Sequence, residues 1–169
     1  MGDSGNDQRE KELTRAKNAA YRLLTYRPRS RTELEDKLGK KEYSEDVIRS
    51  VLDHCIRLGY INDAAFAAQW AAGRARSRGF GSRRIEIELR SKGIEQDIIR
   101  EALAGAVSPE DELAAARRAA EKKLRTMRSV EPNIMKRRLA GFLERKGFPS
   151  EIIWSLVSTL ARTSGQFGE

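Results

Sequence analysis

Cysteine and histidine are almost absent from this sequence, which has one of each, Cys55 and His54, among its 169 residues. A single cysteine excludes an internal disulfide bond, and one histidine with one cysteine cannot supply the ligands of a structural zinc site. The two residues are neighbours, and adjacent side chains on a helix point about 100° apart, so they cannot easily form a nucleophile–base pair. The glycine motifs that bind phosphates or dinucleotides are also missing. We therefore expect a protein that is not an enzyme and that uses no metal or cofactor.

Long apolar runs are missing as well. No stretch approaches the roughly 20 apolar residues that a membrane-spanning helix needs. The N-terminal segment, MGDSGNDQREKE, is polar and carries acids, which is unlike a secretion signal or a transit peptide. Asn6 stands where an N-myristoylation motif needs serine or threonine. We expect no membrane contact and a location in the reducing cytoplasm.

Glycine and proline are sparse and fall between the apolar segments, and aromatic residues make up only 7% of the chain. Strand-like alternation occurs only in the short run Ile85–Leu89, which also fits the helical period. Charged residues make up 34% of the chain, a proportion that suits exposed helices around narrow cores. These features predict an all-α fold.

The segment Gly81–Leu103 contains the repeating unit of the chain. Ser82 is placed to cap a short helix that carries Ile85 and Leu89 on one face. Gly93 ends that helix, and a second helical pattern follows it. Two helices this short cannot bury their apolar stripe alone, so they need neighbours of the same kind.

The chain aligns with itself three times when three leucines are placed in register: Leu38, Leu89 and Leu143. An apolar residue recurs four positions before each leucine, and an acid followed by two apolar residues recurs after it. Gly93 and Gly147 occupy equivalent positions in the second and third copies, where the first copy has Glu42. The pattern predicts a tandem repeat with a period of about fifty residues.

Three copies of this pattern predict nine helices in three groups of three, which form an extended, curved array rather than a globule. We expect a disordered tail, three repeats and a frayed C-terminus over residues 1–10, 11–59, 60–107, 108–162 and 163–169. The first helix is expected to run from near Lys11 to Tyr26, and the protein is expected to be a monomer.

Local signals place several helix starts. Ser30 and Glu33 have the spacing of a capping box, and Ser44, Asn62 and Ser108 are predicted N-caps. Each is followed by residues at helical spacing, so these positions are expected to begin helices.

Two further groups of residues are given structural roles. Glu33, Glu35 and Asp36 are expected on a solvated helix face. Trp70 and Trp154 lie among apolar neighbours at helical spacing, so we expect them in the core rather than as base-stacking platforms.

Positive charge is the informative chemistry of the sequence, which has a formal net charge of +8 and a pI of about 9.9. Such a balance favours nucleic acid or an acidic protein assembly as the partner. Between residues 74 and 84 there are five arginines and no acid, interrupted by Gly79 and Gly81. This segment is either a solvated, flexible loop or an anion-binding elbow whose guanidinium groups pair with carboxylates or phosphates.

The basic residues fall in three clusters: Arg74, Arg76, Arg78, Arg83 and Arg84; Lys136, Arg137 and Arg138; and Arg27, Arg29 and Arg31 around Pro28. All of them except Arg27 are candidate binding residues. A fourth run of basic residues, between Arg117 and Arg125, is more typical of a solvated helix face.

Three motifs follow one another along the chain: Tyr26–Ser30 with Glu33, Leu34 and Leu38; Gly59–Asp63 with Phe66 and Ala67; and Gly81–Ile85 with Glu88, Leu89 and Lys92–Ile94. In this order and spacing they resemble the bacterial RecX regulatory proteins. The resemblance covers essentially the whole chain after the N-terminal tail.

This resemblance implies three tandem three-helix repeats, each similar to a helix-turn-helix, and no catalytic residues. It further implies binding to the RecA recombinase, chiefly to its filament on single-stranded DNA, whose growth or persistence such proteins hinder. Strand exchange, ATP hydrolysis and the co-protease role of RecA in the SOS response fall in consequence, so a role in DNA repair and homologous recombination is expected. Glu42 departs from the glycine of the later copies, which affects only that turn.

Direct DNA binding through helix-turn-helix-like units is the alternative, and basic charge alone supports it equally well. Against it, no helix carries a compact set of Asn, Gln and Arg suited to reading base edges. Specific operator binding at physiological salt would favour this alternative. A scaffold for some other acidic partner is a third interpretation, but it leaves the three motifs unexplained.

Overall fold

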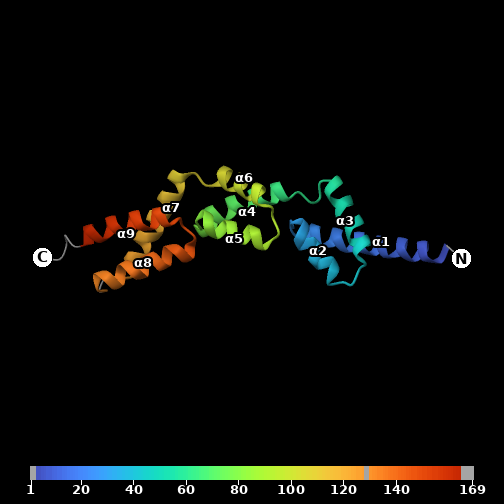
Figure 1. Cartoon of the computed structure of the whole chain (residues 1–169), viewed down its shortest axis with the longest axis horizontal. Helices are drawn as coiled ribbons and strands as arrows, with labels where there is room; N and C mark the ends of the chain where they lie inside the picture. The colour runs from blue at the N-terminus through green and yellow to red at the C-terminus, as the bar shows by residue number, and fades with distance from the viewer. Residues whose placement is uncertain (1–2, 128–129, 165–169) are drawn as a thin grey trace. The chain divides into compact units, whose positions relative to one another are not determined.

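The computed structural model describes residues 3–127 and 130–164 of the chain. Within these ranges the chain forms nine α-helices and no strand, which confirms the predicted all-α fold (Figure 1). The helices are α1 (Asp3–Tyr26), α2 (Arg31–Gly39), α3 (Glu45–Arg57), α4 (Asp63–Arg78), α5 (Ser82–Ser91), α6 (Gln96–Ala106), α7 (Pro109–Leu124), α8 (Pro132–Lys146) and α9 (Ser150–Ser164).

The first helix begins earlier than the sequence suggested. α1 starts at Asp3, so the prediction of a disordered tail up to residue 10 is wrong for the residues that the structure describes. Two ion pairs lie along this polar end. Lys11 Nζ is 2.6 Å from Asp7 Oδ2 one turn away, and Arg9 Nε is 2.8 Å from an oxygen of Asp46 on α3.

The last helix also extends beyond its predicted end. α9 continues to Ser164, whereas fraying was predicted from residue 163. The rest of that predicted frayed segment, residues 165–169, lies outside the described ranges, as do residues 1–2 of the predicted tail.

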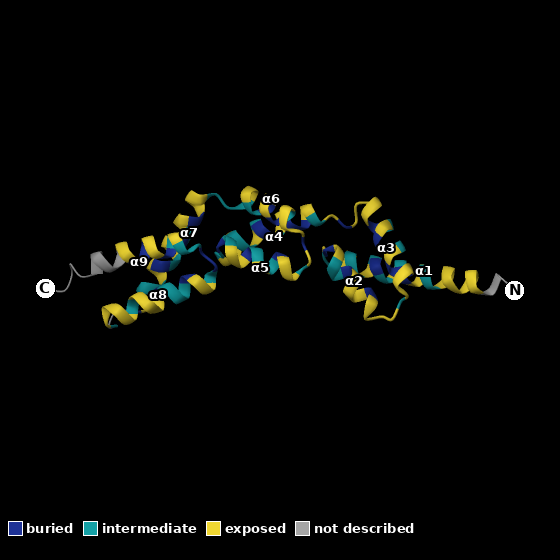
Figure 2. Cartoon of the chain, in the orientation of Figure 1, coloured by how far each residue is buried: buried dark blue, intermediate teal, exposed yellow. Residues whose placement is uncertain are grey.

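The chain divides into two compact units, the first of which consists of residues 1–67 and 90–98. Its core lies among α1, α2 and α3, where Ala16 and Ala20 of α1 are fully buried and allow a close approach of the neighbouring helix. α3 contributes five buried residues to this core, and Figure 2 shows buried residues in dark blue. The buried residues of this core are Ala16, Ala20, Leu34, Leu38, Val47, Ile48, Val51, Leu52, Cys55 and Ile61.

The second unit consists of residues 68–89 and 99–169, and its core lies among α7, α8 and α9. Ala116 and Ala120 give α7 a flat buried face like that of α1, and Phe148 is the largest fully buried side chain. The buried residues of this core are Ala116, Ala120, Met127, Leu139, Leu143, Phe148, Ile153, Leu156 and Val157.

Three predicted caps are present. Ser30 Oγ accepts a hydrogen bond from the backbone N–H of Glu33, whose carboxylate accepts the N–H of Ser30 in return, so the capping box is complete. Asn62 Oδ1 accepts the N–H of Ala65, 2.9 Å away. Ser108 accepts an N–H from the first turn of α7, and Pro109 follows it as the first helical residue.

Two predicted caps differ in detail. Ser44 precedes α3 as expected, but its hydroxyl makes no capping bond, because both its hydroxyl and its N–H donate to the carboxylate of Glu12 on α1. Ser82 is the first residue of α5 rather than its cap. Its N–H donates over 2.6 Å to Glu112 on α7, a buried carboxylate that caps the helix from outside.

No helix within the described ranges is long and apolar enough to cross a membrane.

Candidate functional site

The arginine-rich segment is mostly helical. α4 continues to Arg78, so Arg74, Arg76 and Arg78 lie on its last turns, and only residues 79–81 separate it from α5. Glycine at position 79 adopts a left-handed backbone with φ of 57°, which turns the chain sharply after α4. The flexible loop that the sequence allowed here is therefore only a short turn between two regular helices.

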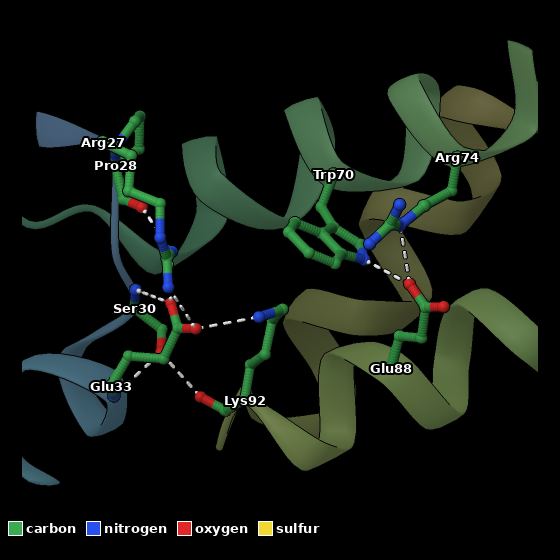
Figure 3. A network of polar contacts seen from close by, with 8 residues as sticks. All are labelled: Arg27, Pro28, Ser30, Glu33, Trp70, Arg74, Glu88 and Lys92. Atoms are coloured by element: carbon green, nitrogen blue, oxygen red, sulfur yellow. Dashed lines mark hydrogen bonds and ion pairs between the residues drawn. The ribbon is translucent and has the colours of Figure 1, made fainter. Parts of the chain in front are cut away.

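Two of the candidate arginines are held by one carboxylate, that of Glu88 on α5. Trp70 Nε1 donates to Glu88 Oε2 over 3.0 Å, and Arg74 Nε lies 2.7 Å from the same oxygen in an ion pair that lacks hydrogen-bond geometry (Figure 3). The Arg74 guanidinium also lies over the Trp70 ring, 4.2 Å from its centroid. Arg84 approaches the other oxygen of Glu88 at 3.4 Å. Arg74 thus serves an internal network, and Arg84 borders it with a side chain that is 48% exposed.

The remaining arginines of this cluster are exposed. Arg83 donates to the hydroxyl of Ser150 at the start of α9, over 2.9 Å. Arg76 donates from Nε to the carbonyl of Ala72, one turn back on α4, while the carbonyl of Arg78 accepts from Lys146 Nζ. The guanidinium groups of Arg76 and Arg78 face solvent at the end of α4.

The other two clusters are placed differently. Arg29 is buried and donates from Nε to the carbonyl of Leu23, so it closes the end of α1. Burial and the neighbouring charge of Arg27 lower the pKa of Arg29. Arg31 is exposed, and its backbone N–H donates to Asp63 at the start of α4.

The cluster at residues 136–138 lies in the first half of α8, and all three side chains are exposed. Successive helical residues point about 100° apart, so these three fan around the helix and do not form one patch. The next residue, Leu139, is buried in the core of the second unit.

Glu33 was expected on a solvated face, and the structure contradicts this. Its carboxylate accepts hydrogen bonds from the two terminal nitrogens of the Arg27 guanidinium group, Nη2 at 3.1 Å and Nη1 at 3.2 Å, and from Lys92 Nζ at 2.8 Å (Figure 3). Burial opposes the charged form, but the bonds to Arg27 and Lys92 outweigh it and lower the pKa of Glu33 to about 2. Glu35 and Asp36 are exposed, as expected.

These contacts form a joint between the first and second repeats, within the first unit. Ser30 Oγ donates to the backbone carbonyl of Lys92 over 2.7 Å, beside the ion pair of Lys92 with Glu33. Gly93 has a φ of 73°, and a Cβ atom there would overlap the side chain of Thr32. We call the contact of residues 30–33 with 92–93 the first joint.

A second joint connects the second and third repeats, within the second unit. The N–H of Gly81 donates to the carbonyl of Lys146 over 2.9 Å, and that of Arg83 donates to the carbonyl of Gly147 over 3.1 Å. Gly147 has a φ of 83°, and a Cβ atom there would overlap the backbone of Arg84. The second joint is thus the contact of residues 81–84 with 146–147.

The two joints are equivalent in the register of the repeats. Ser30 of the first copy corresponds to Gly81 of the second, and both donate to the carbonyl of a lysine, Lys92 or Lys146, at the equivalent position of the next copy. The start of each second helix therefore packs on the turn between the second and third helices of the following repeat. Glu42 occupies this turn in the first repeat with a φ of 62°, and its side chain is exposed.

Comparison with known proteins agrees with this organisation. Models of the first, second and third three-helix domains of RecX match residues 16–55, 62–103 and 110–157. The chain belongs to the RecX family. Each matched range lies within one of the three repeats expected from the sequence.

Regulatory proteins of the RecX family align with most of the length of this chain. The chain is 36% identical over 157 residues to the regulatory protein RecX of Thermobifida fusca, covering 92% of this chain and 84% of that protein. It is 39% identical over 161 residues to that of Mycolicibacterium smegmatis, covering 93% and 85%. A crystal structure of RecX from Lactobacillus salivarius matches with a TM-score of 0.81 and 26% identity, covering 89% of this chain and 97% of that one.

The one histidine and the one cysteine of this RecX-family chain have structural surroundings. His54 Nε2 lies 2.8 Å from the Tyr21 hydroxyl. Cys55 is buried, and burial raises the pKa of its thiol, which disfavours the nucleophilic thiolate. No group of three or more potential metal ligands occurs in the part of the chain that the structure describes.

Sequence reasoning missed the two carboxylates that organise the site, Glu33 and Glu88. Both lie inside the RecX motifs, but neither spacing nor charge reveals partners as distant in sequence as Lys92 is from Glu33. One signal was present in the sequence. Gly93 and Gly147 mark the turns on which a preceding repeat packs, and the first copy, which has no preceding repeat, has Glu42 there instead. Trp154 was also misplaced, since it is 65% exposed on α9, whereas Trp70 is half-buried.

Proposed function

We propose that this chain regulates the RecA recombinase by binding along the RecA filament on single-stranded DNA and inhibiting it. The observation that carries the proposal is the match of three RecX domains, in order, over residues 16–157. Inhibition would reduce strand exchange, ATP hydrolysis and the co-protease activity of RecA, and so modulate DNA repair and the SOS response. It would act in the cytoplasm as a monomer and without catalysis of its own.

The proposed mechanism is multivalent binding. Three repeats present three weak surfaces, and tethering makes the second and third contacts intramolecular, so the sum is much tighter than each part. The two joints support this proposal, because each holds the start of a second helix on the turn of the next repeat. A protein that bridges several RecA subunits opposes the movements by which those subunits exchange and turn over.

The proposed contact residues are the exposed cations among the candidates, apart from Arg84, which contacts Glu88. Arg76 and Arg78 on α4, with Arg83 at the start of α5, offer guanidinium groups that suit carboxylates of RecA or phosphates of its DNA. Arg31 and the exposed residues Lys136, Arg137 and Arg138 add further charge. Arg29, Arg74 and Arg84 are proposed to act through the fold, since they contact Leu23 or Glu88.

The test is ATP hydrolysis by preformed RecA filaments on single-stranded DNA, titrated with this protein. Binding of the protein to the same DNA without RecA is measured beside it. Inhibition well below one molecule per RecA subunit, with weak binding to the bare DNA, is the expected result. Inhibition only where the protein coats the DNA would replace this proposal with direct DNA binding.

A further inference from the structure

The second half of α1 lacks acidic residues. Between Leu13 and Arg27 there is no aspartate or glutamate, whereas the preceding part of the helix carries Asp7, Glu10 and Glu12. α1 therefore changes from a mixed to a wholly cationic charge pattern along its length.

One face of this half-helix combines aromatic, basic and amide groups. Its members have the helical spacing i, i+3, i+4, i+7 and i+8, so they share one side of α1, and Tyr60, after α3, borders it. We call this set the tyrosine face: Asn18, Tyr21, Arg22, Thr25, Tyr26 and Tyr60.

The tyrosine face is hollowed. A cavity of 500 Å³ lies among Tyr21, Leu24, Thr25 and Tyr60, and a shallower hollow follows the α1 residues from Asn18 onward. No carboxylate is among the described residues that line either hollow. An aromatic ring entering here would meet other rings and a guanidinium group, and a negative charge beside it would meet no repulsion from the walls.

The rings of this face are positioned for stacking. Tyr21 is fixed by its contact with His54, and the Tyr60 ring stands at 89° to it with centroids 5.8 Å apart. Tyr26 is 84% exposed and Tyr60 is 56% exposed, so each presents open ring surface to solvent. Three of the four tyrosines in the chain belong to this face. The fourth, Tyr43, packs against the core of the first unit.

We propose that the tyrosine face binds single-stranded nucleic acid. Unpaired bases would stack on Tyr26 and Tyr60, a phosphate would pair with the Arg22 guanidinium, and Asn18 would hydrogen-bond base or sugar. A duplex keeps its bases stacked on one another, so it cannot occupy the rings in this way. The inference goes beyond binding to RecA, since this contact, weak on bare strands, is made by the chain itself and needs no filament.

The experiment uses the full chain without RecA and a fluorescein-labelled oligothymidylate, with fluorescence anisotropy at low and physiological salt. Replacing Tyr26 by alanine should weaken binding about tenfold, and the double change Tyr26→Ala with Tyr60→Ala more than that. Tyr26→Phe keeps the ring and should bind nearly normally. Arg22→Ala should reduce the slope of log affinity against log salt by about one.

Matched controls separate stacking from general effects. Trp154→Ala removes another exposed aromatic ring, on α9, whose exposure of 65% lies between those of Tyr60 and Tyr26, and it should leave oligothymidylate binding unchanged. A duplex of the same length should bind with an affinity that does not depend on Tyr26 or Tyr60. Thermal unfolding of each variant confirms the fold, and the exposure of Tyr26 makes its loss harmless to the core.

Three results would overturn the proposal. The first is unchanged oligothymidylate binding by the double tyrosine variant, and the second is an equal loss on Trp154→Ala. The third is loss of RecA inhibition by the tyrosine variants while oligothymidylate binding stays intact, which would make this face a protein interface. Because the oligothymidylate assay contains no RecA, its failure leaves the proposed regulation of RecA untouched.

Discussion

Lys92, in the second repeat, places its ammonium group 2.8 Å from the carboxylate of Glu33 in the first. Both side chains are largely buried, at 15% and 18% exposure, and the Lys92 carbonyl beside them accepts from Ser30. The pair is therefore part of the first joint, in which backbone and side chains hold the start of α2 on the turn after α5.

Glu33→Gln should lower stability on the order of 2 kcal/mol at neutral pH, allowing for solvent screening of the lost charge. Because folding lowers the pKa of Glu33 from 4.5 to about 2, its contribution is complete above pH 4.5 and is lost as pH falls toward 2. Urea unfolding of both proteins at a series of pH values measures the gap between their free energies of unfolding. A gap that stays constant from neutral to acidic pH would contradict the assignment, and Glu35→Gln, exposed on the same helix, is the control.

Gly147→Ala should destabilise the protein strongly. The new Cβ atom would take up a left-handed backbone, which costs about 1 kcal/mol, and would also overlap the backbone of Arg84, so we expect a total of about 3 kcal/mol. Gly59→Ala is the matched control, because Gly59 also has a positive φ of 72° but open space around it. Thermal unfolding compares the two, and equal losses would mean that the second joint adds nothing.

Glu42→Gly should have the opposite sign. Glu42 carries the left-handed strain that glycine avoids, and its side chain is exposed. The substitution should therefore raise the free energy of unfolding by about 0.5 kcal/mol, after the greater flexibility of glycine in the unfolded chain is counted. Urea unfolding at neutral pH measures the change. A loss of stability would reveal a contact of the Glu42 side chain that supports the turn.

Arg76→Glu with Arg78→Glu should weaken inhibition of RecA ATP hydrolysis at least about tenfold while the protein stays folded, because both guanidinium groups face solvent at the end of α4. The matched control is Arg117→Glu with Arg118→Glu, which changes charge equally on an exposed part of α7. Similar inhibition by the two double variants would show that net charge, and not the end of α4, determines binding. Circular dichroism of both variants checks the helices.

Arg74→Glu tests the opposite expectation for its neighbour on the same helix. It would place a second carboxylate beside Glu88 and remove the cation over Trp70, so it should lower the melting temperature, unlike the Arg76 change. An unchanged melting temperature would mean that the contacts of Arg74 with Glu88 and Trp70 do not stabilise the fold, and Arg74 would then be grouped with the solvent-facing arginines.

The sequence predicted what depends on local spacing. The capping box at Ser30 and the repeat register of Leu38, Leu89 and Leu143 rest on distances of a few residues or on a period, and both signals are visible in a single chain. The joints depend on contacts between segments far apart, and so do the partners of Glu33 and Glu88. Composition could not separate Arg74, which contacts Trp70, from Arg76, which faces solvent, because their sequence surroundings are alike.

Trp154 illustrates a different limit. Its neighbours Ile153 and Leu156 are buried, and the apolar run predicted burial for all three residues. A helix on the surface of a core buries only one face, however, and Trp154 lies on the other. The prediction of disorder for residues 3–10 failed for a related reason. Their composition suits disorder, yet a helix already nucleated by the buried stretch from Ala16 onward extends outward at little further cost.

In each joint, the turn that receives the preceding repeat carries a glycine, which has no side chain. Glu42 stands at the equivalent turn of the first repeat and does have one. A repeat duplicated and inserted ahead of the first one would meet a side chain where Gly93 and Gly147 offer none. Lengthening the array at that end therefore requires a change at residue 42 as well as the added repeat. An engineer who wishes to add a repeat ahead of the first one would therefore change residue 42 first.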